Sequence, residues 1–355
     1  MLLYIHIPFC DSKCFYCAFN SYTDRFHLKH EYMNALKKQL RNNLDNYLIK
    51  DNKKIETVFI GGGTPSTIKA FEYEEIFKMI KPYLEENAEI TTEANPNSAS
   101  YEWLKGMYDL GVNRVSFGVQ SFENNKLKFL GRSHNSNSAI KAIQNAHSIG
   151  FKGINCDIIY GVKNDTLESL KMDFDTAFSL PITHLSAYSL IIEEGTKFFD
   201  TSSVKIDDEE LSYEIFDYIN TKGFHQYEIS NFAINKESES KHNYGYWQHK
   251  EYLGVGAGAV GYVNKQRQYP LKGIEEYIEN PLFYDFEDID ESDVKTEKIL
   301  LGLRCSNGIE ISLFNEQELE KIDDLIKYDK VYIEDNKVFN KNFLLSDELA
   351  LYILD

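Results

Sequence analysis

The chain has 355 residues, of which 43% are hydrophobic and 14% aromatic, and its formal net charge is -18. This composition is typical of a globular protein with one large or two moderate domains, and no apolar run approaches membrane-spanning length. Because 56 acidic residues outnumber 38 basic ones, the surface repels phosphate backbones, so nucleic acid is not an expected partner. A local basic pocket, or an acceptor protein held at a membrane, stays compatible with this charge.

Three cysteines lie close together after the first expected strand, residues 3–7. The x3 then x2 spacing of Cys10, Cys14 and Cys17 suits three irons of a four-iron four-sulfur cluster, and no fourth cysteine lies nearby. Zinc would need four protein ligands, and a disulfide would need an oxidising compartment. The first residues lack a secretory signal pattern, so a cytoplasmic location with reduced thiols is expected. The spacing therefore predicts a cluster whose fourth iron is open to another ligand.

Short β-type runs alternate with amphipathic helical segments through the first half of the chain. The expected strands are residues 3–7, 57–60, 90–93, 114–119, 154–160 and 185–190. The expected helices are residues 30–48, 73–84, 101–110, 138–149, 166–178 and 207–220. Such repeated units indicate an α/β fold with a parallel sheet and right-handed crossovers, either a doubly wound sheet or a partial barrel.

Glycine and polar residues follow these strands, where parallel sheets and barrels gather their functional groups. Besides the cysteines, these residues are Gly61, Gly62, Gly63, Thr64, Glu93, Gln120 and Asp157. Taken singly, each is also typical of a turn, a helix cap or the surface. Their placement after successive strands favours a partial (β/α)6 barrel of the TIM type, because its strand ends converge on one mouth.

An open iron at that mouth could act as a Lewis acid or bind an amino acid by its amine and carboxylate. S-adenosylmethionine is a ligand of the second kind, and its reductive cleavage gives a deoxyadenosyl radical. Backbone groups of the glycines, together with Thr64, Glu93, Gln120 and Asp157, could meet its ammonium and ribose. Arg132 could pair with its carboxylate.

The second half of the chain begins with an aromatic and glycine-rich stretch that ends near residue 269. The acidic segment 284–293 predicts a linker or a solvated loop. A small winged-helix-like α+β domain is expected after it, from helices at 294–303, 313–328 and 347–354 and a hairpin at 330–339. The expected division is 1–223 for the barrel, 224–283 for the aromatic segment and 284–355 for the C-terminal domain.

Gly256, Gly258 and Gly261 match the GxGxxG pattern of dinucleotide-binding sites, with Glu276 near the position of a ribose-binding acid. That fingerprint requires a preceding strand and a following helix. The flanking residues predict neither, so the glycines indicate tight backbone packing. The remaining cysteines, Cys156 and Cys305, are expected in the core.

Five motifs together resemble those of the radical S-adenosylmethionine family of oxygen-independent coproporphyrinogen III oxidases and their relatives. They are YIHIPFC at 4–10 with the two later cysteines, GGGTP at 61–65, SFGVQSF at 116–122, LGR at 130–132 and DIIYG at 157–161. The resemblance implies a 4Fe-4S cluster on Cys10, Cys14 and Cys17. It also implies that S-adenosylmethionine contacts Tyr4, Gly62, Gly63, Thr64, Glu93, Gln120, Arg132 and Asp157.

Two departures separate the chain from these oxidases. Phe19 stands where the oxidases carry a fourth cysteine. The residues KHNYGYW at 241–247, followed by YLGVG at 252–256, resemble the HNxxYW segment of the HemW haem chaperone family. That resemblance implies a protein that binds haem as cargo and passes it to an acceptor protein, and it argues against decarboxylation.

The chemistry of this segment is compatible with haem, because haem iron accepts His or Tyr ligands and porphyrin faces pack on aromatic rings. The groups of this kind are His242, Tyr244, Tyr246, Trp247, His249 and Tyr252. His242 is the expected iron ligand, with Asn243, Tyr246 and Trp247 beside it. In the alternative interpretation His242 and Asn243 cap a turn or a helix and the aromatic rings fill the core. Oxygen-independent decarboxylation, another radical enzyme, and a cluster-bearing interaction protein are the competing functions.

Overall fold

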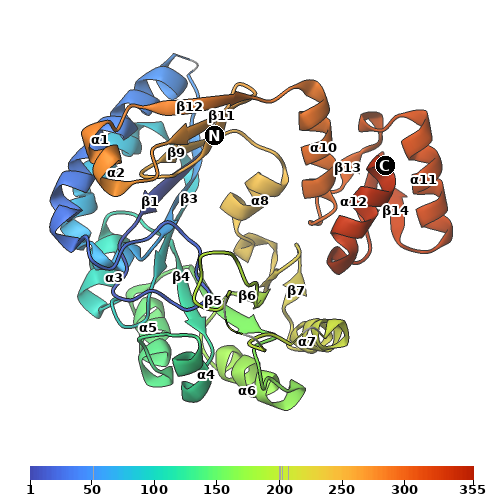
Figure 1. The fold of residues 1–355 in the computed structure, drawn as a ribbon, viewed down its shortest axis with the longest axis horizontal. Coiled ribbons are helices and arrows are strands. Elements are labelled where there is room, and N and C mark those ends of the chain that lie inside the picture. Colours follow the sequence, from blue (N-terminus) through green and yellow to red (C-terminus); the bar gives the residue numbers. More distant parts are fainter. Residues whose placement is uncertain (51, 200, 202, 207) are drawn as a thin grey trace.

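The computed structural model describes residues 1–50, 52–199, 201, 203–206 and 208–355. Its main body is a twelve-stranded sheet whose centre consists of six parallel strands in chain order. These are β1 (Leu2–Ile7), β2 (Ile55–Gly62), β3 (Leu84–Ala94), β4 (Arg114–Gln120), β5 (Gly153–Tyr160) and β6 (His184–Ser189). The sheet curves as a partial barrel, and helices cover its outer side (Figure 1).

The helices that follow these strands confirm the expected α/β alternation. They are α1 (Lys29–Asn43), α2 (Glu74–Ile80), α3 (Tyr101–Asp109), α4 (Asn124–Phe129), α5 (Ser136–Ile149), α6 (Leu167–Phe178) and α7 (Glu209–Thr221). α1 ends five residues before the predicted end, because Leu44–Ile49 continues as a π-helical turn. α4 is too short to show a hydrophobic period and was not predicted. Residue 207, the predicted start of α7, lies outside the described residues.

Local capping explains where several of these helices begin and end. The side chain of Thr166 accepts a hydrogen bond from the Ser169 N–H at 3.2 Å and thereby caps α6. Asn135 caps α5 in the same way. Gly150 ends α5 with φ +109°, a conformation in which an L side chain would be strained. The helices pack their apolar faces on the outward residues of the strands, and this interface is the main core.

The second half of the chain extends the sheet at both edges. The elements are β7 (His225–Gln226), β8 (Asn231–Ala233), α8 (Lys241–Trp247), β9 (Tyr252–Val255), β10 (Gly261–Val263), β11 (Gln266–Pro270), α9 (Ile274–Glu279) and β12 (Tyr284–Asp288). β9 pairs in parallel with β1, and β8 pairs antiparallel with β6. α8 lies on the concave side of the sheet, facing the C-terminal elements (Figure 1).

The linker predicted at 284–293 is wrong. Its first part is β12, which pairs along its length with β11, and α10 begins at Glu291. β12 is an edge strand with mostly exposed side chains, so its acidic residues lie in water while its backbone completes the sheet. The predicted division at residues 223 and 283 stays a prediction.

The last elements form the expected small α+β module with a core of its own. They are α10 (Glu291–Gly302), β13 (Ile309–Glu310), α11 (Glu316–Lys327), β14 (Val331–Glu334), β15 (Lys337–Asn340) and α12 (Ser346–Leu354). The predicted hairpin is confirmed: β14 and β15 meet at Asp335 and Asn336, with φ +46° and +61°. Backbone hydrogen bonds, such as Ile229 N–H to Arg304 O at 2.9 Å, attach the module to the main body.

The glycine-rich turn after β9 differs in part from the expectation. A strand, β9, does precede it, contrary to the prediction, but β10 follows it in place of the helix that a dinucleotide site requires. A Cβ atom on Gly256 would lie 2.7 Å from both His6 O and Tyr32 Oη, so close packing is confirmed as the reason for this glycine. Cys156 and Cys305 are 0% and 1% exposed, as expected of core residues. None of the described helices has the length and apolar character needed to cross a membrane.

Candidate functional site at the barrel mouth and in the barrel interior

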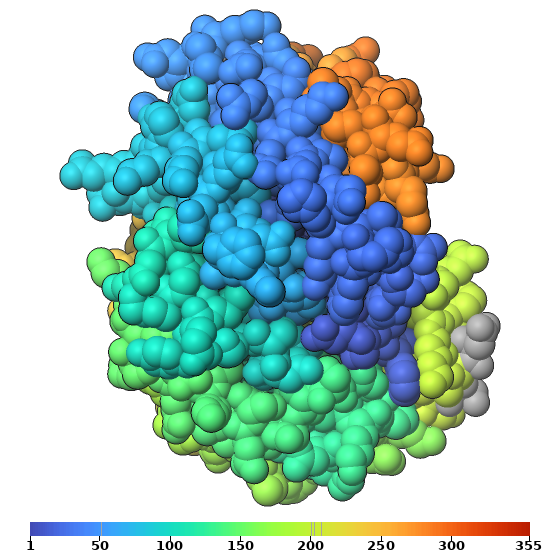
Figure 2. Space-filling model, turned by 90° about the vertical axis from the view of Figure 1, so that its left-hand side faces the viewer, coloured from blue at the N-terminus to red at the C-terminus, as the bar shows by residue number. Residues whose placement is uncertain are grey.

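The loop that carries the three cysteines follows β1 and is held from two sides. On one side, Phe198 N–H donates to Phe15 O at 2.9 Å, and the Lys197 ammonium lies 3.6 Å from the Phe15 ring centroid. On the other side, Arg25 forms an ion pair with Glu275 at 2.6 Å. Figure 2 shows this face, with the dark blue N-terminal residues between the orange and the yellow-green segments. The loop is therefore clamped between parts of the chain that are distant in sequence.

The three thiols are free, and two of them lie beside residues predicted to contact S-adenosylmethionine. Cys10 Sγ is 3.4 Å from Thr64 Oγ1, and Arg132 Nη1 donates to Cys14 Sγ at 3.2 Å. Burial raises the pKa of the Cys10 and Cys17 thiols, so both hold their protons near neutral pH and would release them to a metal. Within the described part of the chain, no three His, Cys, Asp or Glu side chains are close enough to hold a single metal ion.

The backbone after β2 passes so close to β1 and the cysteine loop that only glycine fits there. A Cβ atom on Gly62, which has φ +107°, would lie 2.4 Å from the His6 ring. On Gly63 it would lie 2.8 Å from Ile7 O. The chain can pass this close to β1 and the cysteine loop only without side chains, and this leaves backbone groups facing the mouth.

Two buried carboxyl groups, those of Glu93 and Asp157, lie near enough inside the barrel for the charge of Asp157 to act on Glu93. Glu93 accepts a hydrogen bond from Gly62 N–H at 3.0 Å, and Asp157 accepts one from Asn155 Nδ2 at 2.6 Å. Burial, and then the charge of Asp157, raise the pKa of Glu93 from 4.5 to about 8. Burial also raises the pKa of Asp157. A cationic group between them would relieve this repulsion, so the pair suits an ammonium ligand.

Gln120 and Arg132 come together over Gly118. A Cβ atom on Gly118 would lie 3.0 Å from Gln120 Nε2 and 3.2 Å from Arg132 Nη2. A shift in the β4–β5 register between Phe117 and Gln120 places Gln120 at φ +68°. Arg132 Nε is buried and has no hydrogen-bond partner among the described residues. A buried, unpartnered guanidinium nitrogen beside Cys14 fits an anionic group such as a carboxylate.

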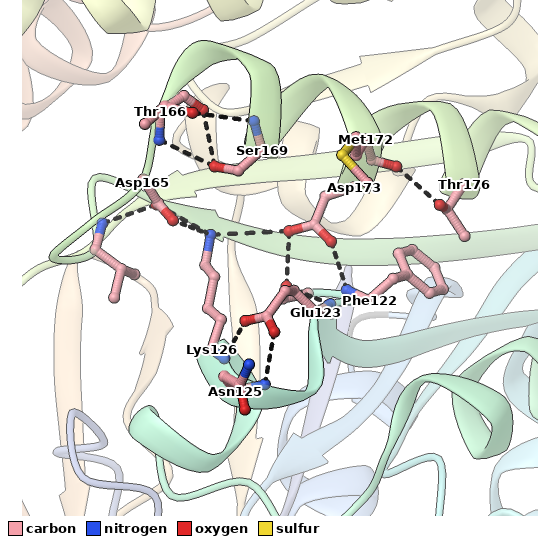
Figure 3. Close-up of polar contacts among 12 residues, drawn as sticks. Phe122, Glu123, Asn125, Lys126, Asp165, Thr166, Ser169, Met172, Asp173 and Thr176 are labelled. Carbon is pink, nitrogen blue, oxygen red and sulfur yellow. Dashed lines mark hydrogen bonds and ion pairs between the residues drawn. The ribbon is translucent and has the colours of Figure 1, made fainter.

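A buried charge cluster fixes the loops that follow β4 and β5 (Figure 3). Lys126 Nζ lies 2.9 Å from Asp165 and 3.9 Å from Asp173, and their side chains are 8%, 4% and 5% exposed. Asp173 also accepts hydrogen bonds from Ser121 Oγ at 2.7 Å and Phe122 N–H at 2.6 Å, directly after Gln120. Asp165 accepts one from the Val162 N–H. The cluster therefore joins the loop that carries Gln120 to the loop that follows Asp157.

Tyr4 connects this mouth with a second part of the barrel interior. Its hydroxyl donates to His6 Nδ1 at 2.9 Å, while His6 Nε2 donates to Asn20 O in the cysteine loop at 2.9 Å. Burial lowers the pKa of His6 to about 4, so its ring is neutral. Tyr4 also lines a cavity of about 560 Å³.

This cavity lies between β1, β2, α8, the β9–β11 strands and α10, so it spans the junction of the main body and the C-terminal module. Its volume is in the range of small-molecule sites. Its aromatic walls include Tyr4, Phe59, Tyr246, Tyr252 and Tyr262. Two cations, Lys250 and Arg267, line it as well.

Three of the four predicted haem residues line this cavity, namely His242, Asn243 and Tyr246. His242 is 1% exposed, with Nδ1 2.7 Å from Thr57 Oγ1 and Nε2 3.0 Å from Tyr246 Oη. Burial lowers its pKa to about 3. The fourth, Trp247, does not line the cavity and instead packs against the Arg304 guanidinium, 5.9 Å from its ring. The helix cap of α8 is Ser240, so His242 and Asn243 do not cap it.

Sequence reasoning missed the polar layer beneath the mouth. Asn155 Nδ2 donates to Ser116 Oγ at 2.7 Å and to Ser186 Oγ at 3.0 Å, and His184 Nδ1 bonds with Asn155 Oδ1 at 2.6 Å. These residues alternate with apolar ones along β4, β5 and β6. That alternation was a usable signal of inward-facing positions in a barrel.

The partial barrel, the cysteine loop and the glycine turn define a radical SAM protein. The sequence model of the Radical SAM superfamily matches residues 4–177. Among solved structures, coproporphyrinogen III oxidase (HemN) from Escherichia coli superposes with a TM-score of 0.82 over 99% of this chain and 89% of its own. Their sequences are 19% identical, so this likeness concerns the fold.

Curated relatives specify the family further. The chain is 36% identical to Heme chaperone HemW of Bacillus subtilis (strain 168), over 91% of this chain and 88% of that protein. It is 31% identical to Heme chaperone HemW of Lactococcus lactis over 99% and 93% of the two chains. The Escherichia coli (strain K12) protein of the same name is 37% identical over 74% and 70%. This chain belongs to the HemW haem chaperone family.

Proposed function

We propose that this protein binds haem and transfers it to an acceptor protein, and that Cys10, Cys14 and Cys17 hold a 4Fe-4S cluster whose open iron takes S-adenosylmethionine. Membership of the family supports this proposal, because the relatives are named as haem chaperones. The same proposal places the protein in the cytoplasm and allows its acceptor protein to be associated with a membrane.

The observation that carries the haem part is the cavity of about 560 Å³ beside α8. It is bounded by the segment that matches HNxxYW, and its aromatic walls suit the face of a porphyrin. His242, Asn243 and Tyr246 contribute to its wall, whereas Trp247 packs on Arg304 outside it.

The residues at the mouth would act on S-adenosylmethionine by position and charge. Thr64 and the backbone of Gly62 and Gly63 would border the amino acid part, Glu93 and Asp157 would attract its ammonium, and Arg132 would hold its carboxylate. Gln120 and Tyr4 would bound the remainder. A bound cluster would supply the electron for radical chemistry.

One anaerobic sample tests the proposal in two assays. After cluster reconstitution, haem is added in steps and the Soret band is recorded. In parallel, coproporphyrinogen III is incubated with the protein, a reductant and S-adenosylmethionine. We expect a saturating Soret shift and no decarboxylated product.

Turnover of coproporphyrinogen would instead establish the competing function, oxygen-independent decarboxylation. Phe19 argues against it, since it replaces the fourth cysteine of the oxidases and its side chain is 69% exposed. If the protein neither binds haem nor turns over coproporphyrinogen, the chaperone proposal is rejected. Another radical enzyme or a cluster-bearing interaction protein would then be the remaining functions.

A further inference from the structure

The cavity contains two histidines, and their hydrogen-bonding surroundings differ. His242 and His249 both line it. Both are buried, since His242 is 1% exposed and the side chain of His249 5%, but in His242 both ring nitrogens are hydrogen-bonded, to Thr57 and to Tyr246. Binding of iron to His242 would break one of these bonds and leave a buried partner unsatisfied.

His249 has the pattern of a metal-binding histidine. Its Nε2 is 2.7 Å from Glu297 Oε2, and among the described residues no group hydrogen-bonds with its Nδ1. Histidines that bind metals commonly donate their other ring N–H to a carboxylate, which fixes the tautomer and raises the basicity of the ligand nitrogen. Here the carboxylate is itself held, because Arg267 Nη2 donates to Glu297 Oε1 at 2.5 Å.

The backbone conformation of His249 also supports a functional role for this residue. Lys250 N–H donates to Gly245 O at 3.0 Å and His249 N–H to Tyr246 O at 2.9 Å, which is a Schellman ending of α8. His249 occupies its left-handed position, with φ +55°, where glycine is usual. A histidine at this position is sterically unfavourable by about 1 kcal/mol, and such strain is concentrated at functional sites.

We propose that His249, oriented by Glu297 and Arg267, supplies the axial nitrogen to haem iron in this cavity, through Nδ1. His242 is then a buried wall residue that holds Tyr246 and Thr57 in place. The inference rests on the proposed haem function. It also links haem to the C-terminal module, because Glu297 belongs to α10.

The test is a titration of full-length protein with ferric haem, followed by visible absorption and electron paramagnetic resonance. Four proteins are compared: wild type, His249→Ala, His242→Ala and the control His225→Ala. His225 also pairs with a carboxylate, Glu239 at 2.9 Å, but it does not line the cavity and its side chain is 45% exposed. We expect His249→Ala to lose the spectrum of nitrogen ligation and to bind haem at least about tenfold more weakly. Added imidazole should restore the nitrogen spectrum in His249→Ala, whereas His225→Ala should match wild type.

Glu297→Gln provides a second test, which remains informative even if the His242→Ala variant does not fold. It keeps the shape of the side chain but weakens the support of His249, so we expect haem affinity about tenfold lower with nitrogen ligation retained. The inference is overturned if His249→Ala keeps the wild-type spectrum, or if only His242→Ala loses it. In either case wild type still binds haem and the proposed function stands. Absence of haem binding by wild type would reject both.

Discussion

At the scale of single residues, the buried carboxyl group of Glu93 has a cost in stability. Its pKa is raised from 4.5 to about 8 by burial and by Asp157. Between these two pH values the folded protein holds a proton that the unfolded chain has lost. Stability of the ligand-free protein therefore falls as pH rises through this window and levels off above it.

Glu93→Gln removes that ionisation while its amide oxygen can still accept from Gly62 N–H. The free energy of unfolding of the variant should exceed that of wild type by a margin that grows from pH 5 to pH 8, reaching on the order of 2 kcal/mol. Urea unfolding at both pH values measures it. Binding of S-adenosylmethionine should weaken in the same variant. Identical pH profiles for the two proteins would contradict this account of Glu93.

The cysteines give a second prediction at this scale. Replacement of Cys10, Cys14 or Cys17 by alanine should abolish the charge-transfer absorbance of the reconstituted cluster, because each thiolate would bind a separate iron. Cys156→Ala and Cys305→Ala are matched controls, since both thiols are free and buried in the core. A cluster retained in all three loop variants would place its ligands elsewhere.

At the scale of elements, the Lys126 cluster holds two loops through three side chains. Lys126→Met would leave Asp165 and Asp173 buried without their cation. We expect a loss of about 3 kcal/mol in the free energy of unfolding, with weaker binding of S-adenosylmethionine because the loops of Gln120 and Asp157 are loosened. Thermal or urea unfolding and calorimetric titration measure the two effects.

The control is Lys222→Met. Lys222 follows α7 and forms an ion pair of 2.7 Å with Asp175, which lies on α6 like Asp173 but is 52% exposed. Exposed pairs contribute little, so this change should lower stability by less than about 1 kcal/mol. If both variants lost the same free energy of unfolding, burial would not be the reason why the ion pairs of Lys126 stabilise the protein. Unaltered S-adenosylmethionine binding in Lys126→Met would separate the cluster from the mouth.

The sequence predicted the elements whose signals are local. Buried apolar runs located all six parallel strands, and the helix predicted at 166–178 does begin at Thr166, whose side chain caps α6. β12 escaped prediction because an exposed edge strand can be acidic, and its pairing with β11 is a property of the sheet. The left-handed Gln120 depends on a register shift between β4 and β5, which neither strand shows alone.

At the scale of the whole molecule, the cavity unites segments that are far apart in the chain. Tyr4, Phe59, His242, Arg267 and Glu297 all line it. The sequence identified the aromatic segment around His242 but could not show that β1, β2 and α10 complete its walls. It also could not separate His242 from Trp247, because only the packing of α8 turns one toward the cavity and the other toward Arg304.

The most direct test of the central claim is whether haem binds in this cavity. Val260 lines it and is half-buried, so Val260→Trp should fill part of its volume. Leu351→Trp is the control: it introduces the same large side chain on the surface of α12, where Leu351 is 60% exposed. Haem is titrated into each protein and the Soret band is followed. We predict saturation at one haem per chain for wild type and Leu351→Trp and no saturable binding for Val260→Trp, whereas a wild type that fails to saturate, or a Val260→Trp protein that binds like wild type, would contradict the claim.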